Sequence, residues 1–126
     1  MANELILVIE DNEKNRKLVR DVLQVKGYRV IEADSAEVAL TLAAEQTPDL
    51  VLMDIHLPGM SGIQALARLR EMPATRAIPV VAFTASVMPQ DRREIMSAGF
   101  DGFVEKPINL KEFLATVAAV IGRGKA

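Results

Sequence analysis

The sequence contains no cysteine and no tryptophan, and it has only one tyrosine and four phenylalanines. Without cysteine there can be no disulfide and no thiolate metal site, so the core alone must stabilise the fold. So few aromatic side chains argue against a surface on which nucleic-acid bases could stack. Fifteen basic and seventeen acidic residues give a net charge of −2. We therefore expect no direct DNA binding.

Long hydrophobic segments are also missing. The first apolar run, Leu5–Ile9, has no basic leader before it and is too short for a signal peptide core or a membrane span. The length of 126 residues suits one compact domain, and 50% hydrophobic with 25% charged residues is typical of a globular chain. We expect a cytoplasmic protein that does not enter a membrane.

Short apolar runs alternate with amphipathic segments along the whole chain. The runs are Leu5–Ile9, Tyr28–Ala33, Leu50–Met53, Pro79–Phe83 and Gly102–Val104. Three of these runs have no polar interruption, which is typical of strands that are covered on both faces of a parallel sheet. Regular alternation of strands and helices predicts an α/β/α sandwich of three layers with right-handed crossovers.

The segments between these runs have helical spacing. The apolar side of the first helix contains Leu18, Val19, Val22, Leu23 and Val25. The opposite side, which is expected to face solvent, contains Lys14, Arg16, Arg20 and Asp21. Capping-box spacing at Asp34–Glu37 and Asn109–Glu112 predicts the starts of the second and fifth helices. We place the third helix at 63–72 and the fourth at 89–98. Glycines 27, 99 and 122 are expected to end the first, fourth and fifth helices.

Ligand sites of parallel sheets lie beyond the carboxyl ends of the strands, so the residues after each apolar run are the candidates. These are Glu10 and Asp11 after the first run, Asp54 after the third, Thr84 after the fourth, and Glu105, Lys106 and Pro107 after the fifth. Crowded carboxylates repel one another unless a cation lies among them, and an oxygen-only site suits Mg²⁺. Beside such a cation Asp54 could act as a nucleophile toward phosphorus, with Thr84 and Lys106 stabilising the phosphoryl oxygens.

Each of these residues also has a purely structural interpretation. Glu10 and Asp11 could be solvated residues before a helix, and Asp54 could be a turn residue. Thr84 could cap a loop, and Lys106 could be an ordinary surface lysine. The functional hypothesis depends on finding all of them at strand ends in one sequence.

With these motifs the sequence resembles the receiver domain of bacterial two-component response regulators. The matching stretches are 9–12 (Ile-Glu-Asp-Asn), 49–54 (Asp-Leu-Val-Leu-Met-Asp), 57–62 (Leu-Pro-Gly-Met-Ser-Gly), 83–85 (Phe-Thr-Ala) and 105–107 (Glu-Lys-Pro). They span nearly the whole chain. The resemblance implies a flavodoxin-like (βα)5 fold with a five-stranded parallel sheet of order 2-1-3-4-5.

The resemblance also implies roles for individual residues. Asp54 would be the phosphoacceptor, and Mg²⁺, which Mn²⁺ can replace, would be held by Glu10, Asp11, Asp54 and the main-chain carbonyl of His56. Thr84, Ala85, Lys106 and Pro107 would surround the phosphoryl group, with a cis bond before Pro107. Phe103 would hold the position of an aromatic switch residue, although permanent burial explains a phenylalanine equally well.

His56 is the only histidine in the chain. Its position after Asp54 is variable in the family and tunes reaction rates there, so a role as catalytic base or phosphohistidine is not expected.

We expect residues 1–122 to form the receiver domain and residues 123–126 a short polar tail. The resemblance is greatest to stand-alone receivers of the DivK type, although a receiver cut from a hybrid kinase would look the same. It implies a sensor histidine kinase or histidine phosphotransfer protein as donor, and a monomer or weak dimer. A downstream protein would bind the face made by the fourth helix, fifth strand and fifth helix. Beyond its own phosphorylation and dephosphorylation, no enzymatic activity is expected.

Three alternatives remain open. A haloacid-dehalogenase-like phosphatase also uses an aspartate nucleophile, but it carries a second Asp where this chain has His56. A flavodoxin-like cofactor binder needs a phosphate loop after the first strand, where Glu10 and Asp11 would repel phosphate. A degenerate receiver would bind partners without being phosphorylated.

Overall fold

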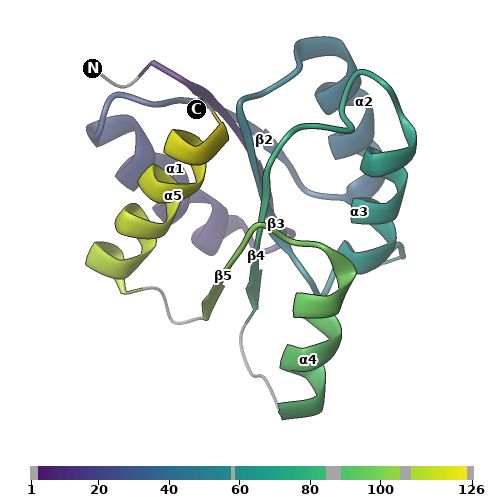
Figure 1. Ribbon diagram of the computed structural model, residues 1–126. Coiled ribbons are helices and arrows are strands. Elements are labelled where there is room, and N and C mark those ends of the chain that lie inside the picture. Colours follow the sequence, from purple (N-terminus) through teal and green to yellow (C-terminus); the bar gives the residue numbers. More distant parts are fainter. Residues whose placement is uncertain (1–2, 58, 85–88, 106–108, 125–126) are drawn as a thin grey trace.

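A computed structural model of the chain describes residues 3–57, 59–84, 89–105 and 109–124. The elements alternate strictly along the chain (Figure 1). In order they are β1 (Leu5–Ile9), α1 (Glu13–Val25), β2 (Arg29–Ala33), α2 (Ala36–Gln46), β3 (Leu50–Asp54), α3 (Gly62–Glu71), β4 (Val80–Thr84), α4 (Pro89–Ala98), β5 (Gly102–Glu105) and α5 (Leu110–Gly124). The described helices include none that is long and apolar enough to cross a membrane.

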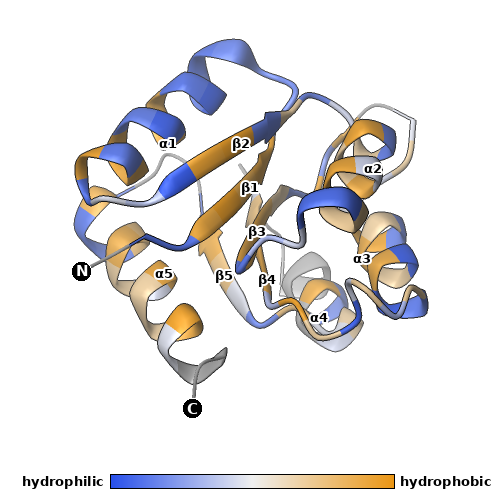
Figure 2. Ribbon diagram, turned by 90° about the horizontal axis from the view of Figure 1, so that it is seen from above, coloured by the Kyte–Doolittle hydropathy of each residue, from blue (hydrophilic) through white to orange (hydrophobic). Residues whose placement is uncertain are grey.

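The strands form one parallel sheet of order β2-β1-β3-β4-β5, as predicted. Helices α1 and α5 cover one face, and α2, α3 and α4 cover the other (Figure 1). Apolar residues line the strands and the inner sides of the helices, while hydrophilic residues lie outside (Figure 2). The result is the three-layer α/β/α sandwich expected from the alternation of elements.

Successive strand residues belong to opposite layers of the core. Ile6 and Val8 pack with α1 and α5, whereas Leu7 and Ile9 pack with α2, α3 and α4. Central strands β3 and β4 are buried along their full length, whereas edge strand β2 is only partly buried. Burial on both faces explains why the central strands appear in the sequence as unbroken apolar runs.

The apolar side predicted for α1 includes residues that are exposed in the structure. Val19 and Leu23 are buried, but Leu18 is 45% exposed and Val25 84% exposed. Val25 is the last residue of the helix, beyond the region that the sheet covers. Arg16 was expected to face solvent, yet its side chain is only 19% exposed because it bends back toward the end of β1.

The helix ends agree with the predicted boundaries to within two residues. Gly27 and Gly99 have φ of 91° and 104°, the left-handed conformation expected of glycines that end helices. The N-cap of α2 is Ser35 rather than Asp34, and its hydroxyl accepts from the Val38 N–H. Helix α3 begins at Gly62 instead of 63, after a capping box between Ser61 and Gln64. Gly122 does not end α5, which continues to Gly124.

Candidate functional site

The carboxyl ends of the three central strands lie level with one another. Ile9 of β1 is paired with Met53 of β3, and Asp54 is paired with Phe83 of β4. Residues that follow these positions therefore meet at one edge of the sheet. The register confirms that the strand ends selected from the sequence lie together at one edge of the sheet.

Glu10 and Asp11 follow β1 and have opposite exposure. Glu10 is fully buried, and its N–H donates to the Ala33 carbonyl over 3.1 Å, which extends the pairing of β1 with β2. Its side-chain Oε2 accepts from the Asn12 N–H over 3.3 Å. Asp11 is exposed. A buried and an exposed carboxylate thus stand next to each other in the chain.

Asp54 is the last residue of β3 and is only 4% exposed. Its Oδ1 accepts a hydrogen bond from the His56 N–H over 3.0 Å. This contact limits rotation of the carboxylate. Asp54 therefore presents a fixed carboxylate at the centre of the sheet edge.

Gly62, at the start of α3, packs directly against the main chain at Asp54. A Cβ at this position would lie 2.7 Å from the Asp54 carbonyl oxygen and 2.9 Å from the Cα of Ile55. The Gly62 N–H also donates to the Ile55 carbonyl over 3.0 Å. The loop after β3 can close over the site only because this residue has no side chain. Its tight approach was not predicted, since a glycine in a turn gives no sign of what lies against it.

Glu10, Asp11 and Asp54 each offer a carboxylate oxygen, and these oxygens lie within 4.8 Å of one another. Such a cluster repels itself unless a cation lies between its members. The donors are all hard oxygens, without imidazole or thiolate, which fits Mg²⁺ rather than a transition metal. The exposure of Asp11 leaves one side of the cluster open to solvent, as an ion that retains water ligands requires.

Thr84, the last residue of β4, is fully buried. Its hydroxyl has no hydrogen-bond partner within the described part of the chain. Leaving a buried hydroxyl unpaired costs about 1–3 kcal/mol, so native structures rarely do so without a functional reason. The residue that sequence reasoning assigned to phosphoryl binding thus has a buried side-chain oxygen without a hydrogen-bond partner among the described residues.

Other candidates lie around this centre. His56 is exposed, and Phe103 of β5 is half-buried against the core layer that includes Ile95 of α4. Partial burial of Phe103 fits neither a fully inward nor a fully outward side chain. The predicted roles of Ala85, Lys106 and Pro107, and the cis bond before Pro107, lie outside the described residues.

Comparison with known proteins agrees with this architecture. Residues 6–118 match the response regulator receiver domain family. The polar-differentiation response regulator DivK of Brucella ovis is 40% identical over 117 residues, covering 93% of this chain and 95% of DivK. DivK of Brucella anthropi is 39% identical with the same coverage.

Solved structures of similar fold include receiver domains of two kinds. One is the receiver domain of the sensor histidine kinase PA1611 of Pseudomonas aeruginosa, with a magnesium ion coordinated in its active-site cleft. It has a TM-score of 0.88 and 31% identity, covering 95% of this chain and 98% of that one. Another is the chemotaxis protein CheY4 of Vibrio cholerae, with a TM-score of 0.87 and 26% identity, covering 94% and 98%. The chain belongs to the response regulator receiver domain family.

Proposed function

We propose that Asp54 is the phosphoacceptor of this receiver domain. We further propose that Glu10, Asp11, Asp54 and the main-chain carbonyl of His56 hold Mg²⁺, which Mn²⁺ can replace. Receiver domains as a family bind Mg²⁺ in an acidic pocket and are phosphorylated on an aspartate. The assignment to these residues is carried by one observation: three carboxylates from two adjacent strand ends lie within 4.8 Å of one another.

The chemistry follows from the placement of Asp54. A carboxylate oxygen of Asp54 attacks the phosphorus of a phosphohistidine donor, and the bond between phosphorus and imidazole nitrogen breaks with its electron pair remaining on nitrogen. The His56 N–H, bound to Oδ1, keeps the carboxylate oriented for this attack. Bound Mg²⁺ supplies positive charge that offsets the charge on the phosphoryl oxygens.

The Thr84 hydroxyl is proposed to donate a hydrogen bond to an oxygen of the phosphoryl group, with Ala85, Lys106 and Pro107 completing the pocket. The buried hydroxyl of Thr84, which has no hydrogen-bond partner in the part of the chain that the structure describes, supports this role. Phe103 is proposed to shift further into the core when the Thr84 hydroxyl moves toward the phosphoryl group. Its half-buried position, next to the layer that contains Ile95 of α4, leaves area still to be buried.

The donor is proposed to be a sensor histidine kinase or a histidine phosphotransfer protein, the partners to which receiver domains are related. The effector is proposed to bind α4, β5 and α5, where Leu110 at the start of α5 is 46% exposed. We propose residues 1–122 as the receiver domain and 123–126 as a tail, whose first two residues continue α5. We also propose a monomer or weak dimer and a cytoplasmic location.

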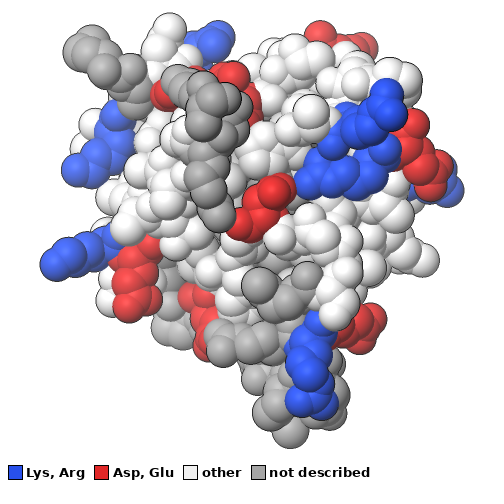
Figure 3. Space-filling view, in the orientation of Figure 1, with Lys and Arg blue, Asp and Glu red and all other residues white. Residues whose placement is uncertain are grey.

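Direct DNA binding is not part of this proposal. On the face shown in Figure 3, the described basic and acidic side chains are interspersed. On this face the described residues thus offer no broad positive surface for a phosphate backbone, and the net charge of the chain is −2.

The alternatives identified from the sequence receive less support. At the position of the second Asp of dehalogenase-like phosphatases stands His56, whose main chain is tied to Asp54. Glu10 and Asp11 at the end of β1 would repel the phosphate of a flavin cofactor. We therefore propose no enzymatic activity beyond phosphorylation and dephosphorylation of the domain itself.

The test is incubation with acetyl phosphate and MgCl₂, followed by intact-mass measurement. One added phosphoryl group is expected in the wild-type protein, and none in Asp54→Asn or after chelation of the metal. The matched control is Asp34→Asn, an exposed aspartate that follows β2 but does not belong to the acidic cluster. It should be phosphorylated like the wild type.

Phosphorylation that persists in Asp54→Asn would refute the site assignment. Complete absence of phosphorylation in the wild type would favour a degenerate receiver. Sustained hydrolysis of a phosphomonoester that depends on Asp54 would favour the phosphatase alternative.

A further inference from the structure

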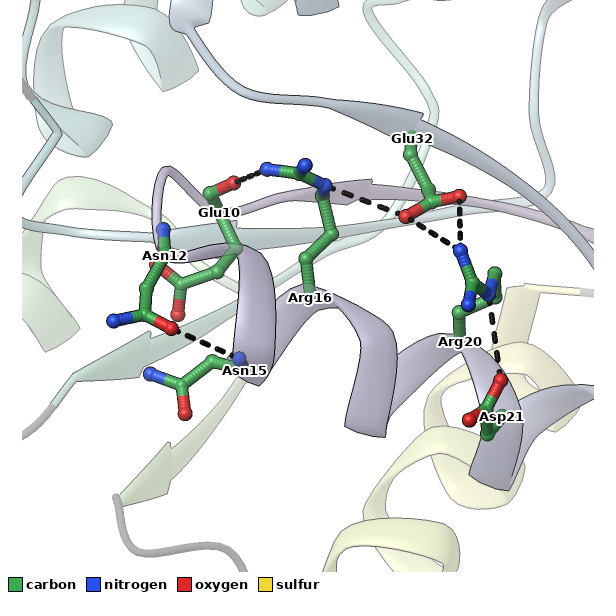
Figure 4. A network of polar contacts seen from close by, with 7 residues as sticks. All are labelled: Glu10, Asn12, Asn15, Arg16, Arg20, Asp21 and Glu32. Carbon is green, nitrogen blue, oxygen red and sulfur yellow. Dashed lines mark hydrogen bonds and ion pairs between the residues drawn. The ribbon is translucent and has the colours of Figure 1, made fainter.

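Arg16, in the first turns of α1, makes contacts that neither the metal nor the phosphoryl chemistry uses (Figure 4). Its Nη1 donates to the main-chain carbonyl of Glu10 over 2.8 Å, and its Nε lies 3.3 Å from Oε1 of Glu32 on β2. The planar guanidinium therefore bridges the loop after β1 and the edge strand. Only 19% of the side chain is exposed, so the bridge is partly shielded from solvent.

Glu32 is held in turn by a second arginine. Arg20, one turn further along α1, places Nη1 3.2 Å from Oε2 of Glu32 and Nε 3.4 Å from Oδ1 of Asp21. The hydrogen bond to Glu32 raises the pKa of Arg20 above its ordinary value, which is itself high enough to keep the guanidinium charged. Two cations and two anions make the network neutral. It can therefore hold Glu10 without presenting a strong net field to the acidic cluster.

Arg16 binds the peptide group that joins Glu10 to Asp11. The Glu10 carbonyl belongs to the peptide group that leads into Asp11, so fixing this oxygen fixes the plane from which Asp11 starts. On the other side, Oδ1 of Asn12 accepts from the Asn15 N–H over 3.0 Å and caps α1. Asp11 is exposed but lies between two anchored neighbours.

We propose that Arg16 is a positioning residue for the cation site: by binding the Glu10 carbonyl it fixes the main chain that presents Glu10 and Asp11 to the divalent ion. This inference rests on the proposed function of the acidic cluster. Groups that orient metal ligands from behind typically change metal affinity by about tenfold to a hundredfold. Arg16 acts through the main chain, so a change of about tenfold is expected.

The sign of the effect separates positioning from simple electrostatics. Removing a cation near three carboxylates should, through charge alone, strengthen the binding of Mg²⁺. Loss of the anchored peptide should weaken it, because the ion must then order the loop when it binds. A weaker affinity after neutralisation of Arg16 therefore reports lost orientation.

The experiment is a titration of the full-length protein with MgCl₂, followed through amide shifts in ¹H–¹⁵N NMR spectra, with urea unfolding of each variant alongside. Arg16→Gln should raise the Mg²⁺ Kd about tenfold, and Arg16→Lys, which keeps the charge but loses the rigid fork, should raise it less. The matched control is Arg20→Gln, which also removes a partner of Glu32 but does not contact Glu10. Its Kd should stay near that of the wild type even if its stability falls.

The outcomes are distinct. A rise of at least about threefold in Arg16→Gln, with little change in Arg20→Gln, supports the inference. An unchanged or tighter Kd in Arg16→Gln, or an equal rise in Arg20→Gln, overturns it while leaving the proposed metal site intact. If Arg16→Gln does not fold, Arg16→Lys decides by the direction of its change. Absence of Mg²⁺ binding to the wild type, with Asp11→Asn as the negative control, would overturn the proposed function itself.

Discussion

Replacement of Asp11 by Asn gives a sharp test of the idea that the three carboxylates of the acidic cluster repel one another unless a cation lies between them. In the wild type, carboxylate oxygens of Asp11, Glu10 and Asp54 lie within 4.8 Å of one another. The amide of asparagine has nearly the same shape as the carboxylate but no charge. The substitution therefore removes two repulsive pairs and leaves the packing unchanged.

The magnitude follows from Coulomb's law. At 4.8 Å a pair of like charges is unfavourable by about 1 kcal/mol in bulk water and about 3.5 kcal/mol at an effective dielectric constant of 20. Because Asp11 is exposed, the lower figure applies to each of its two neighbours. Partial screening by salt reduces the sum further. Without divalent cations, Asp11→Asn should raise the free energy of unfolding by about 1–2 kcal/mol.

In the presence of Mg²⁺ the wild type should become more stable than Asp11→Asn. An ion that binds only the folded state stabilises it by about 2.7 kcal/mol at a concentration of about 100 times its Kd. The wild type should gain most of this amount, and Asp11→Asn, which has lost a ligand, should gain much less. Urea unfolding at low ionic strength, in EDTA and in saturating MgCl₂, measures both effects through the midpoint at constant m-value.

Asp34→Asn serves as the control, because Asp34 is exposed at the end of β2 and lies outside the cluster. Its stability should be nearly unchanged in both conditions. If Asp11→Asn is less stable than the wild type in EDTA, or if the two respond equally to Mg²⁺, the electrostatic reasoning is wrong.

Two further pairs of substitutions test the surroundings of the site. Gly62→Ala should destabilise the domain by about 2–4 kcal/mol, because the new Cβ would lie 2.7 Å from the Asp54 carbonyl oxygen. Gly122→Ala, at a position in α5 with open space around it, should instead stabilise the domain by about 0.5–1 kcal/mol, and thermal unfolding of both variants measures the difference. Thr84→Val should raise the unfolding free energy by up to about 1 kcal/mol, because it removes a buried hydroxyl that has no partner among the described residues, yet it should weaken any phosphorylation-dependent shift of amide resonances. The same change at Thr75, whose hydroxyl donates over 2.6 Å to a main-chain carbonyl of α3, should lower stability by about 1–3 kcal/mol, and equal effects at both threonines would contradict the argument.

The sheet and the strand-end residues were predictable because one physical rule places them. Strands buried on both faces are uninterrupted apolar runs, and parallel strands in register bring their carboxyl ends to one edge. Neither step depends on which rotamers the side chains adopt. Glu10, Asp54 and Thr84 were therefore identified, and each lies at the end of its strand or directly after it.

Features that depend on side-chain direction were predicted less well. The apolar arc of α1 included Val25, which is 84% exposed, because periodicity shows only that a residue shares a side of the helix and not how far the sheet extends. Arg16 was assigned to solvent by the same pattern, since a sequence does not show that a long side chain bends back toward the start of its helix. Gly62 belongs to this group too, because the atoms it contacts come from another element.

The placement of the site has a consequence for how a phosphoryl group would be detected. The fully buried residues of β3 before Asp54 anchor that carboxylate in the core, so added charge on Asp54 cannot be relieved by moving the strand. We expect the response at two side chains, the Thr84 hydroxyl, which has no hydrogen-bond partner among the described residues, and the half-buried ring of Phe103. Thr84 lies on β4 and Phe103 on β5, on the side of β3 away from the Glu10–Asp11 loop. The order of the strands thus places Glu10 and Asp11, which are proposed to bind the cation, on one side of Asp54, and Thr84 and Phe103, which are proposed to respond to the phosphoryl group, on the other side.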